Sequence, residues 1–425
     1  MKGLLDKINT KLNAQGGFLK AVSVLVGGTA FAQLIGFLCL PFLTRLYSPE
    51  DYSILGVYIA MVSILSVISS LRFDIAIPIP QQEDEGKALL LLALLSNTIF
   101  FVVLYIFLFL IHPFIQDFKI IKQLSYWIWL VPFGVYISGL YSALQYWATR
   151  HKRFKDIAQT RMTQAIFGNG TSLATGAVWG GFWGLILGQI LNFSGGLVKL
   201  ATSAKKDLSL IKSSPLKDTF SKYSNFPKYS TFEALANTSA IQLPLIIIAS
   251  FVIGPEVGYL MMAMKVLAIP SALIGASLAQ VYLSEAPLYY KKQQLYKYTL
   301  TIQLKILKLI ILPFIILALI SPYIFTIIFG EQWKELGFFI LILMPSCFMQ
   351  LQSSPISMAL HVIGRQKIAL WLQFFGFVIR VLFLFLVMLY DKKLFLVYYA
   401  LSSFIFYVVY YFLIIFCLKK ANNEG

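Results

Sequence analysis

Residues 88–111 read ALLLLALLSNTIFFVVLYIFLFLI, an apolar run that contains no charged side chain. A helix needs about 20 mostly apolar residues to cross a hydrocarbon layer ~30 Å thick. This run is long enough, and a helix satisfies every backbone N–H and C=O group inside the bilayer. The alternating segments of ~10 residues that would indicate a membrane β-barrel do not occur. Residues 88–111 therefore predict a transmembrane helix.

Further stretches have the same apolar character, and the sequence predicts twelve spans in all. The others are 19–43, 53–79, 124–148, 158–178, 182–200, 230–252, 258–283, 300–328, 336–360, 368–389 and 395–417. Of the 425 residues, 59% are hydrophobic and only 12% are charged, whereas soluble domains carry about 25% charged residues. This composition excludes a soluble enzyme and favours an all-α polytopic membrane protein.

The basic residues predict how these spans are oriented. Most of the 35 Lys and Arg residues fall on the side that holds both termini, and few fall in the loops of the opposite side. Because short cytoplasmic loops carry the excess of Lys and Arg, both termini are expected in the cytoplasm. The net charge of +17 is then a topological signal rather than the footprint of a nucleic-acid partner.

Several tryptophans stand close to predicted span ends, among them Trp147, Trp179, Trp333 and Trp371. Amphipathic aromatic rings are enriched at the two interfaces between a membrane and water. These four positions therefore predict interfacial rings and support the span boundaries.

The chain divides around its longest inward loop, the basic segment 201–229. We expect an interfacial N-terminal segment at 1–17, followed by a first lobe of six spans at 18–200. A second lobe of six spans is expected at 230–418, and a cytoplasmic tail at 419–425.

The two predicted lobes echo each other at their first outward turns. Tyr47-Ser-Pro49-Glu50 precedes the second span, and Ile253-Gly-Pro255-Glu256 precedes the eighth. Proline beside glutamate is ordinary chemistry for a helix start, but its shared place in each half favours a parallel repeat. Transporters built from such repeats bind their substrate between the repeats, so we expect a central cavity between the lobes.

Five basic residues lie inside predicted spans. Lys305 and Lys308 stand near an inward helix start and can reach the interface, which leaves Arg72, Lys265 and Arg380. Arg72 lies nine residues before Gln81, which places it about 13 Å deep at 1.5 Å per residue. A cation inside a membrane is costly and by default marks a functional site. A cationic cavity attracts an anion, and in a lipid bilayer the natural anion is the phosphate or pyrophosphate of a lipid head group, which Arg and Lys bind well. We therefore assign substrate binding to these three residues. An acid on another helix would explain Arg72 instead, and a long stem reaching the interface would explain Lys265.

Acids and amides inside the spans are the next candidates. Asp74 and Glu233 could carry a coupling proton, because a carboxyl group removed from water holds its proton more readily. Glu233 also stands at a helix start, where the helix dipole alone favours an acid. Gln33, Gln242 and Gln280 could bind sugar hydroxyls, although hydrogen bonds between helices explain them equally well.

The sequence offers no sign of a catalytic domain. No loop is long enough to hold one, and there is no Walker A loop, H-E-x-x-H motif or nucleophile elbow. The three cysteines lack the spacing of metal ligands. We therefore expect no enzyme, no metal and no cofactor, and only a proton or sodium gradient as a driving force.

The first lobe resembles Wzx-type O-antigen flippases, the polysaccharide-transporter branch of the MOP exporter superfamily. The similarity covers residues 20–90, and the twelve-span plan extends it over the whole chain. Its most specific part is the pair Pro41-Phe-Leu-Thr-Arg45-Leu-Tyr47-Ser-Pro49-Glu50-Asp51-Tyr52 and Leu71-Arg72-Phe73-Asp74. The family more often has Glu where this chain has Asp74.

The resemblance implies a function and a location. It implies that an oligosaccharide linked to undecaprenyl pyrophosphate is moved from the cytoplasmic to the periplasmic leaflet of a bacterial inner membrane by alternating access. It also implies a cationic lumen and ion coupling. Membrane lipids, a polysaccharide polymerase and a chain-length regulator are the further partners that it implies.

Two alternative functions remain open. A cation-coupled multidrug exporter of the same superfamily would place acids against a cationic drug, whereas these spans hold more bases than acids. A polytopic glycosyltransferase or polymerase would place acids in an outward loop, as Glu50 and Asp51 are placed here. Helix N-terminal chemistry explains that pair of acids more simply.

Overall fold

The computed structural model describes residues 17–208, 214–252, 254–270, 282, 285–286, 288–357 and 359–424. All regular elements in these ranges are helices. Ten segments of them are long and apolar enough to cross a membrane, and each overlaps a predicted span. The protein is a multi-pass α-helical membrane protein, as its composition predicts.

Two of the twelve predicted spans are not among these ten segments. Residues 158–178 lie in α8 (Phe154–Val178), a continuous helix that is rich in Thr, Gln and Gly. Residues 258–283 begin in α13 (Glu256–Pro270), and most of those beyond Pro270 lie outside the described residues. The count of twelve spans and the six-plus-six repeat therefore stay predictions.

The chain separates into two compact units. Unit 1 holds the described residues up to Tyr47 together with Met61–Leu235. Unit 2 holds Ser48–Ala60 and the described residues from Ala236 onward. The helix α3 (Pro49–Ser69) contributes its first half to unit 2 and its second half to unit 1.

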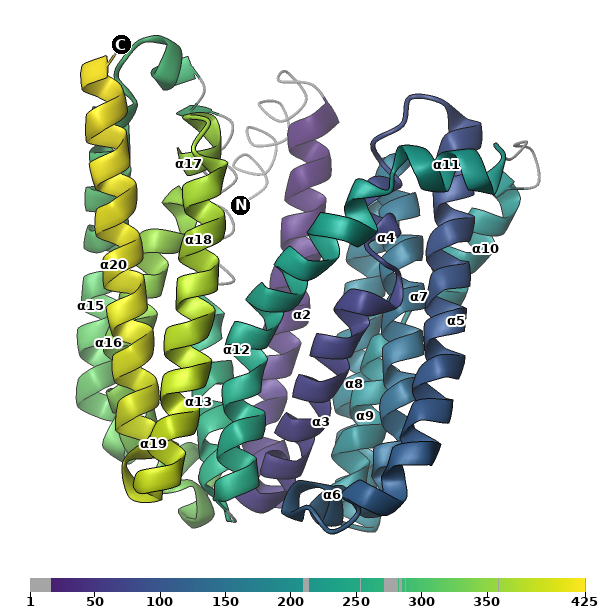
Figure 1. The fold of residues 1–425 in the computed structure, drawn as a ribbon. Helices are drawn as coiled ribbons and strands as arrows, with labels where there is room; N and C mark the ends of the chain where they lie inside the picture. Colours follow the sequence, from purple (N-terminus) through teal and green to yellow (C-terminus); the bar gives the residue numbers. More distant parts are fainter. Residues whose placement is uncertain are drawn as a thin grey trace, which may run out of the picture. The chain divides into compact units, whose positions relative to one another are not determined.

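Unit 1 is a bundle of long helices with short connecting helices at its ends (Figure 1). Besides α3 and α8 its elements are α2 (Gly17–Leu46), α4 (Phe73–Ala76), α5 (Glu83–Ile115), α6 (Lys119–Leu124), η1 (Ser125–Trp129), α7 (Leu130–Arg150), α9 (Trp183–Ser194), α10 (Leu197–Leu208), α11 (Leu216–Lys222) and η2 (Phe226–Ser230).

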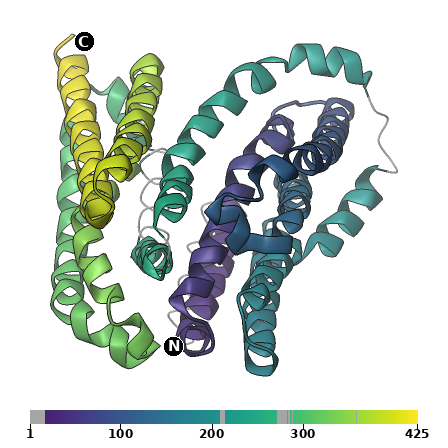
Figure 2. The same ribbon diagram turned by 60° about the horizontal axis from the view of Figure 1, so that its bottom comes forward.

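Unit 2 also consists of long helices, and α15, α16 and α20 lie side by side in both views (Figures 1 and 2). Besides α13 its elements are most of α12 (Thr231–Phe251), α15 (Leu295–Phe329), η4 (Glu331–Trp333), α16 (Leu336–Ser353), η5 (Ser354–Ile356), α17 (Ala359–Val362), α18 (Gln366–Phe377), η6 (Val378–Phe383), α19 (Leu384–Tyr390), η7 (Lys392–Leu394) and α20 (Phe395–Glu424).

Small residues let α2, α8 and α9 pack closely in unit 1. A Cβ added at Gly184 would collide with the side chains of Thr175 and Tyr47. The Tyr47 hydroxyl uses this space to donate a hydrogen bond to the Ser172 carbonyl of α8 at 2.6 Å. Close approach through glycine is how helices associate inside a bilayer, where lipid removes the hydrophobic drive for association.

The acidic turn at residues 48–51 is a helix cap. The Asp51 carboxylate accepts hydrogen bonds from the Ser48 backbone N–H at 2.9 Å and from the Ser48 hydroxyl at 3.0 Å. The Asp51 N–H donates back to the Ser48 oxygen at 3.2 Å. This reciprocal arrangement is a capping box with proline at the first helical position. Asp51 therefore starts α3.

The two turns that echo each other in the sequence are in contact within unit 2. The Gly258 N–H donates a hydrogen bond to the Ser53 hydroxyl at 2.7 Å, and that hydroxyl lies 3.1 Å from the Gly254 carbonyl. A side chain at Gly258 would collide with the Pro49 carbonyl. Glycine is therefore required where the starts of α3 and α13 meet.

The tryptophans only partly follow the prediction of interfacial rings. Trp179 and Trp371 are exposed, in agreement with it, but Trp147 and Trp333 are at most 1% exposed. The Trp147 indole donates to Asp207 of α10 at 3.1 Å. Trp333 packs edge-on against Tyr52 in unit 2. For Trp147 and Trp333 the prediction is wrong, because packing and a buried acceptor outweigh the position at a span end.

The segment 201–229, predicted as a loop, is largely helical where it is described. It contains the end of α10, α11 and η2. Lys222 at the end of α11 forms an ion pair with Glu85 of α5 at 2.5 Å. By accepting this hydrogen bond, the Glu85 carboxylate raises the pKa of Lys222. Part of the basic charge of the segment therefore holds α11 on α5. Of the predicted N-terminal segment 1–17, all but Gly17 lies outside the described residues.

Candidate functional site

The second predicted span is broken at Arg72. Helix α3 ends at Ser69 and α4 begins at Phe73, with Leu71 at φ 50° and Arg72 at φ 59° between them. The left-handed region costs a residue with a Cβ about 1–2 kcal/mol. The predicted depth of Arg72 assumed one continuous helix, and it is therefore wrong. Strained backbone of this kind persists only where the surrounding structure holds it in place.

Asp74 supplies part of that surrounding structure. Its side chain is buried, and its carboxylate accepts hydrogen bonds from the Ser70 hydroxyl at 2.9 Å and from the Ser142 hydroxyl of α7 at 2.5 Å. Both carboxylate oxygens are thus engaged, and the second bond ties α4 to α7. Asp74 and Arg72 lie close together in unit 1, but the structure shows no ion pair between them.

Arg150 holds the other end of the broken segment. Only 6% of its side chain is exposed, and it lies 3.2 Å from the Glu83 carboxylate. Its guanidinium donates to the carbonyls of Ile77 at 3.0 Å, Pro80 at 2.6 Å and Gln82 at 2.9 Å. In the sequence, Arg150 is one of the basic loop residues on the side that holds both termini, and its place there predicts only topology. The available signal was the proline-rich linker after α4, whose carbonyls need donors from elsewhere.

Arg72 itself is half-buried and incompletely satisfied. Its Nε is buried, and it finds no hydrogen-bond partner among the described residues. None of the ion pairs in the described part of the chain includes Arg72. Its charge acts on the Tyr146 hydroxyl of α7, which also lies in the field of Asp74. A half-buried guanidinium that forms no ion pair within the described residues is suited to bind an anion.

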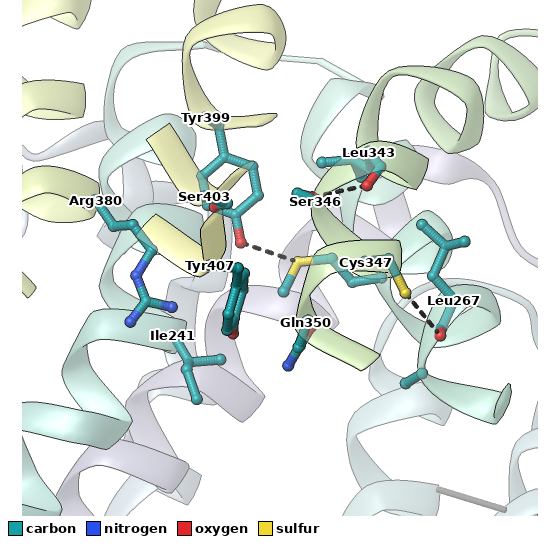
Figure 3. A pocket seen from close by; sticks show the side chains of 12 residues that line it. Ile241, Leu267, Leu343, Ser346, Cys347, Gln350, Arg380, Tyr399, Ser403 and Tyr407 are labelled. Carbon is teal, nitrogen blue, oxygen red and sulfur yellow. Dashed lines mark hydrogen bonds between the residues drawn. The ribbon is translucent and has the colours of Figure 1, made fainter. Parts of the chain in front are cut away.

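Unit 2 contains a cavity of about 220 Å³ that Arg380 lines. Its walls come from α12, α13, α16, η6 and α20, and Figure 3 shows the side chains around it. Arg380 is 5% exposed and belongs to the π-helical turn η6. Such turns interrupt α-helices most often at functional sites.

The Arg380 guanidinium is held from one side by two contacts. Its Nε–H donates to the Gly376 carbonyl at 3.1 Å, and its carbon lies 4.4 Å from the centre of the Phe406 ring. A Cβ at Gly376 would collide with that ring, so glycine is needed for the ring to lie there. The stacking is a cation–π interaction, which is favourable for Arg in a desolvated site.

The polar groups that surround Arg380 were not predicted from the sequence. Tyr399, Ser403 and Tyr407 line the cavity from α20, and Gln350 lines it from α16. The residues of α20 recur every four positions, which places them on one face of a helix. A polar stripe of this period inside an apolar helix was the signal available in the sequence.

The remaining predicted residues do not join either site in the described structure. Lys265 is exposed on α13, Glu233 is exposed in the first turn of α12, and Gln33 is exposed on α2. Gln242 is half-buried in α12, and Gln280 lies outside the described residues. Their roles stay predictions. The described residues contain no group of three or more His, Cys, Asp or Glu side chains that could hold a metal ion.

Solved transporters have the same fold. The inward-facing conformation of a multidrug resistance MATE family transporter of the MOP superfamily is 13% identical. The match covers 94% of this chain and 96% of that one, with a TM-score of 0.66. The lipid II flippase MurJ in its inward closed conformation is 12% identical, with 93% and 87% coverage and a TM-score of 0.71. An outward-facing MATE transporter is 15% identical, with 94% and 96% coverage and a TM-score of 0.61.

These likenesses establish a fold of the MOP-transporter type. No curated protein matches the sequence significantly. The profile of the family described as polysaccharide biosynthesis protein matches residues 42–337, well over half of the chain. The protein therefore belongs to the polysaccharide biosynthesis protein family.

Proposed function

We propose that the protein is a flippase for undecaprenyl-pyrophosphate-linked polysaccharide repeat units of the O-antigen class. It moves them from the cytoplasmic to the periplasmic leaflet of a bacterial inner membrane by alternating access. A proton or sodium gradient drives the movement, and both termini lie in the cytoplasm. The observation that carries the proposal is Arg72, a cation held at a helix break with its Nε unpartnered among the described residues.

Arg72 supports the proposal through its missing counter-charge. Removing a charge from water costs several kcal/mol unless another charge or a hydrogen bond compensates. Asp74, the nearest acid in the sequence, uses both carboxylate oxygens on serine hydroxyls. An anionic ligand would complete the site, and inside a bilayer that ligand is the phosphate of a lipid head group, which an Arg fork binds well.

The same observation weighs against the multidrug alternative. A cationic drug needs carboxylates that are free to face it. The described acid next to Arg72 is engaged in the structure of unit 1, and Arg380 gives the cavity of unit 2 a positive charge. The chemistry of both sites thus supports an anionic substrate.

The proposal is tested by a leaflet assay on the full chain reconstituted into vesicles. Lipid-linked oligosaccharide is supplied on one side, and its appearance on the other is measured with and without a pH or sodium gradient. We expect Arg72→Gln to lower the rate at least about tenfold, because losing a charge-assisted hydrogen bond costs about 1.5–3 kcal/mol. Lys155→Gln, which removes an exposed charge from the same unit, should leave the rate unchanged.

Two results would overturn the proposal. The first is a wild-type protein that inserts and folds but does not move the lipid-linked oligosaccharide under either gradient. The second is an Arg72→Gln variant that moves it at the wild-type rate. Transport of cationic drugs by the same vesicles would instead favour the exporter alternative.

A further inference from the structure

The cavity of unit 2 encloses a positive charge without an acid to balance it. None of the twelve residues that line it is acidic, and the described part of the chain contains no ion pair with Arg380. Arg380 is 5% exposed, so water compensates little of its charge. An unpaired buried ion costs several kcal/mol. A counter-charge bound in the cavity would offset that cost.

The protein satisfies only part of the guanidinium. An Arg side chain carries five N–H donors, and the Gly376 carbonyl takes the one on Nε. Phe406 covers one face of the guanidinium plane at 4.4 Å from its ring centre. The terminal nitrogens lie next to Tyr407, whose hydroxyl accepts one of their N–H groups and whose ring centre lies 5.8 Å from the guanidinium carbon (Figure 3). The remaining terminal N–H groups are left at the cavity side. The contacts of Gly376 and Phe406 thus aim a fork of N–H groups at the cavity.

In the rest of the wall, two side chains are hydrogen-bonded to carbonyl groups, and one amide is added to the lining. Ser346 donates to the Leu343 carbonyl at 2.7 Å, and Cys347 donates to the Leu267 carbonyl at 3.4 Å. These carbonyls, which could otherwise bind a cation, are already used by side chains of the wall. Gln350, on the other side of Tyr407 from Arg380 in Figure 3, adds an amide group to the lining.

We propose that this cavity is a binding site for an oxyanion of the phosphate class, with Arg380 as its fork. A volume of about 220 Å³ compares with ~30 Å³ for one water molecule in the liquid. The cavity thus has room for a phosphate or pyrophosphate group with some water, but not for an oligosaccharide repeat unit. The anion is either a free ion or the head group of a lipid, and the head-group case rests on the proposed flippase function.

Anion binding is measured on the full chain purified in detergent, by isothermal titration with inorganic phosphate and with pyrophosphate. Saturable binding to the wild type is expected. Arg380→Lys keeps the charge but loses the planar fork, so we expect binding at least about tenfold weaker. Lys308→Gln removes an exposed charge of the same unit and should bind like the wild type.

A second variant tests the site without changing Arg380. Cys347→Met adds volume to the cavity wall and should also weaken binding, since the anion then lacks room. The proposal is overturned if the wild type shows no saturable binding, or if both Arg380→Lys and Cys347→Met bind like the wild type. This titration involves no transport, so its failure leaves the flippase assay to be judged separately.

The two sources of the anion are separated in lipid nanodiscs. If polyprenyl pyrophosphate displaces free pyrophosphate at a far lower concentration than pyrophosphate itself does, the site takes a lipid head group. If the two compete equally, it takes a free ion. Failure of both to compete for the site in nanodiscs would overturn the assignment of the cavity to a phosphate-class anion.

Discussion

Replacement of Arg150 by methionine should destabilise unit 1 without removing any group from the proposed anion sites. Arg150→Met keeps most of the buried stem but loses all three hydrogen bonds to the carbonyls of residues 77–82. A buried acceptor left without its donor costs about 1–3 kcal/mol. Taking about 2 kcal/mol for each of the half-buried carbonyls of Ile77 and Pro80 gives about 4 kcal/mol. The ion pair with Glu83, whose own side chain is half exposed, adds little to the free energy of unfolding.

A loss of this size is measurable as a shift in Tm. For a unit of this length, 1 kcal/mol corresponds to about 2–4 °C, so Arg150→Met should lower Tm by about 8–16 °C. The assay is thermal unfolding of the purified protein followed by tryptophan fluorescence, because Trp147 is buried three residues before Arg150. Arg150→Lys can still donate to part of the carbonyls, and we expect about half of the shift.

The control for this prediction is Lys155→Gln, which removes one positive charge from an exposed position shortly after α7. Its Tm should stay close to that of the wild type, because surface substitutions change stability by about 0.5 kcal/mol or less. The reasoning fails if Arg150→Met melts at the wild-type temperature. It also fails if the control falls by the same amount, since net charge would then be the cause.

Three further predictions follow from the same contacts. Asp74→Asn should keep one acceptor for a serine hydroxyl and lower the free energy of unfolding by about 1 kcal/mol, whereas Asp74→Ala should lower it by about 2–4 kcal/mol; both are measured as a shift in Tm. Unchanged transport by Asp74→Asn would show that Asp74 does not carry the coupling ion. Gly184→Ala should lower Tm by several degrees, because the added Cβ would collide with Tyr47 and Thr175. The double variant with Tyr47→Phe should recover part of this loss. Equal Tm values for the wild type and Gly184→Ala would contradict this packing. A fluorescent protein fused after Gly425 should fluoresce and alkaline phosphatase fused there should be inactive, because the basic loops predict a cytoplasmic C-terminus. The reverse pattern would invert the predicted topology.

The sequence by itself predicted the membrane class and most of the spans. A run such as residues 88–111 is mostly apolar, and the free energies of moving its residues from water into lipid add up along the chain. The cap at Ser48 and Asp51 was equally accessible, because both partners lie within one turn of the helix start. Arg72 and Arg380 were recognised as costly charges for the same local reason.

The tertiary structure decided what those charges contact. The break at Arg72 is held by Ser142, far along the chain, and the role of Arg150 depends on the carbonyls after α4. The Arg380 guanidinium is held at the cavity because Gly376 lets the Phe406 ring approach it. Hydrophobicity belongs to each residue and adds along a chain. A hydrogen bond between distant segments, or a cavity, needs parts of the chain that only folding brings together, so it is absent from local sequence patterns.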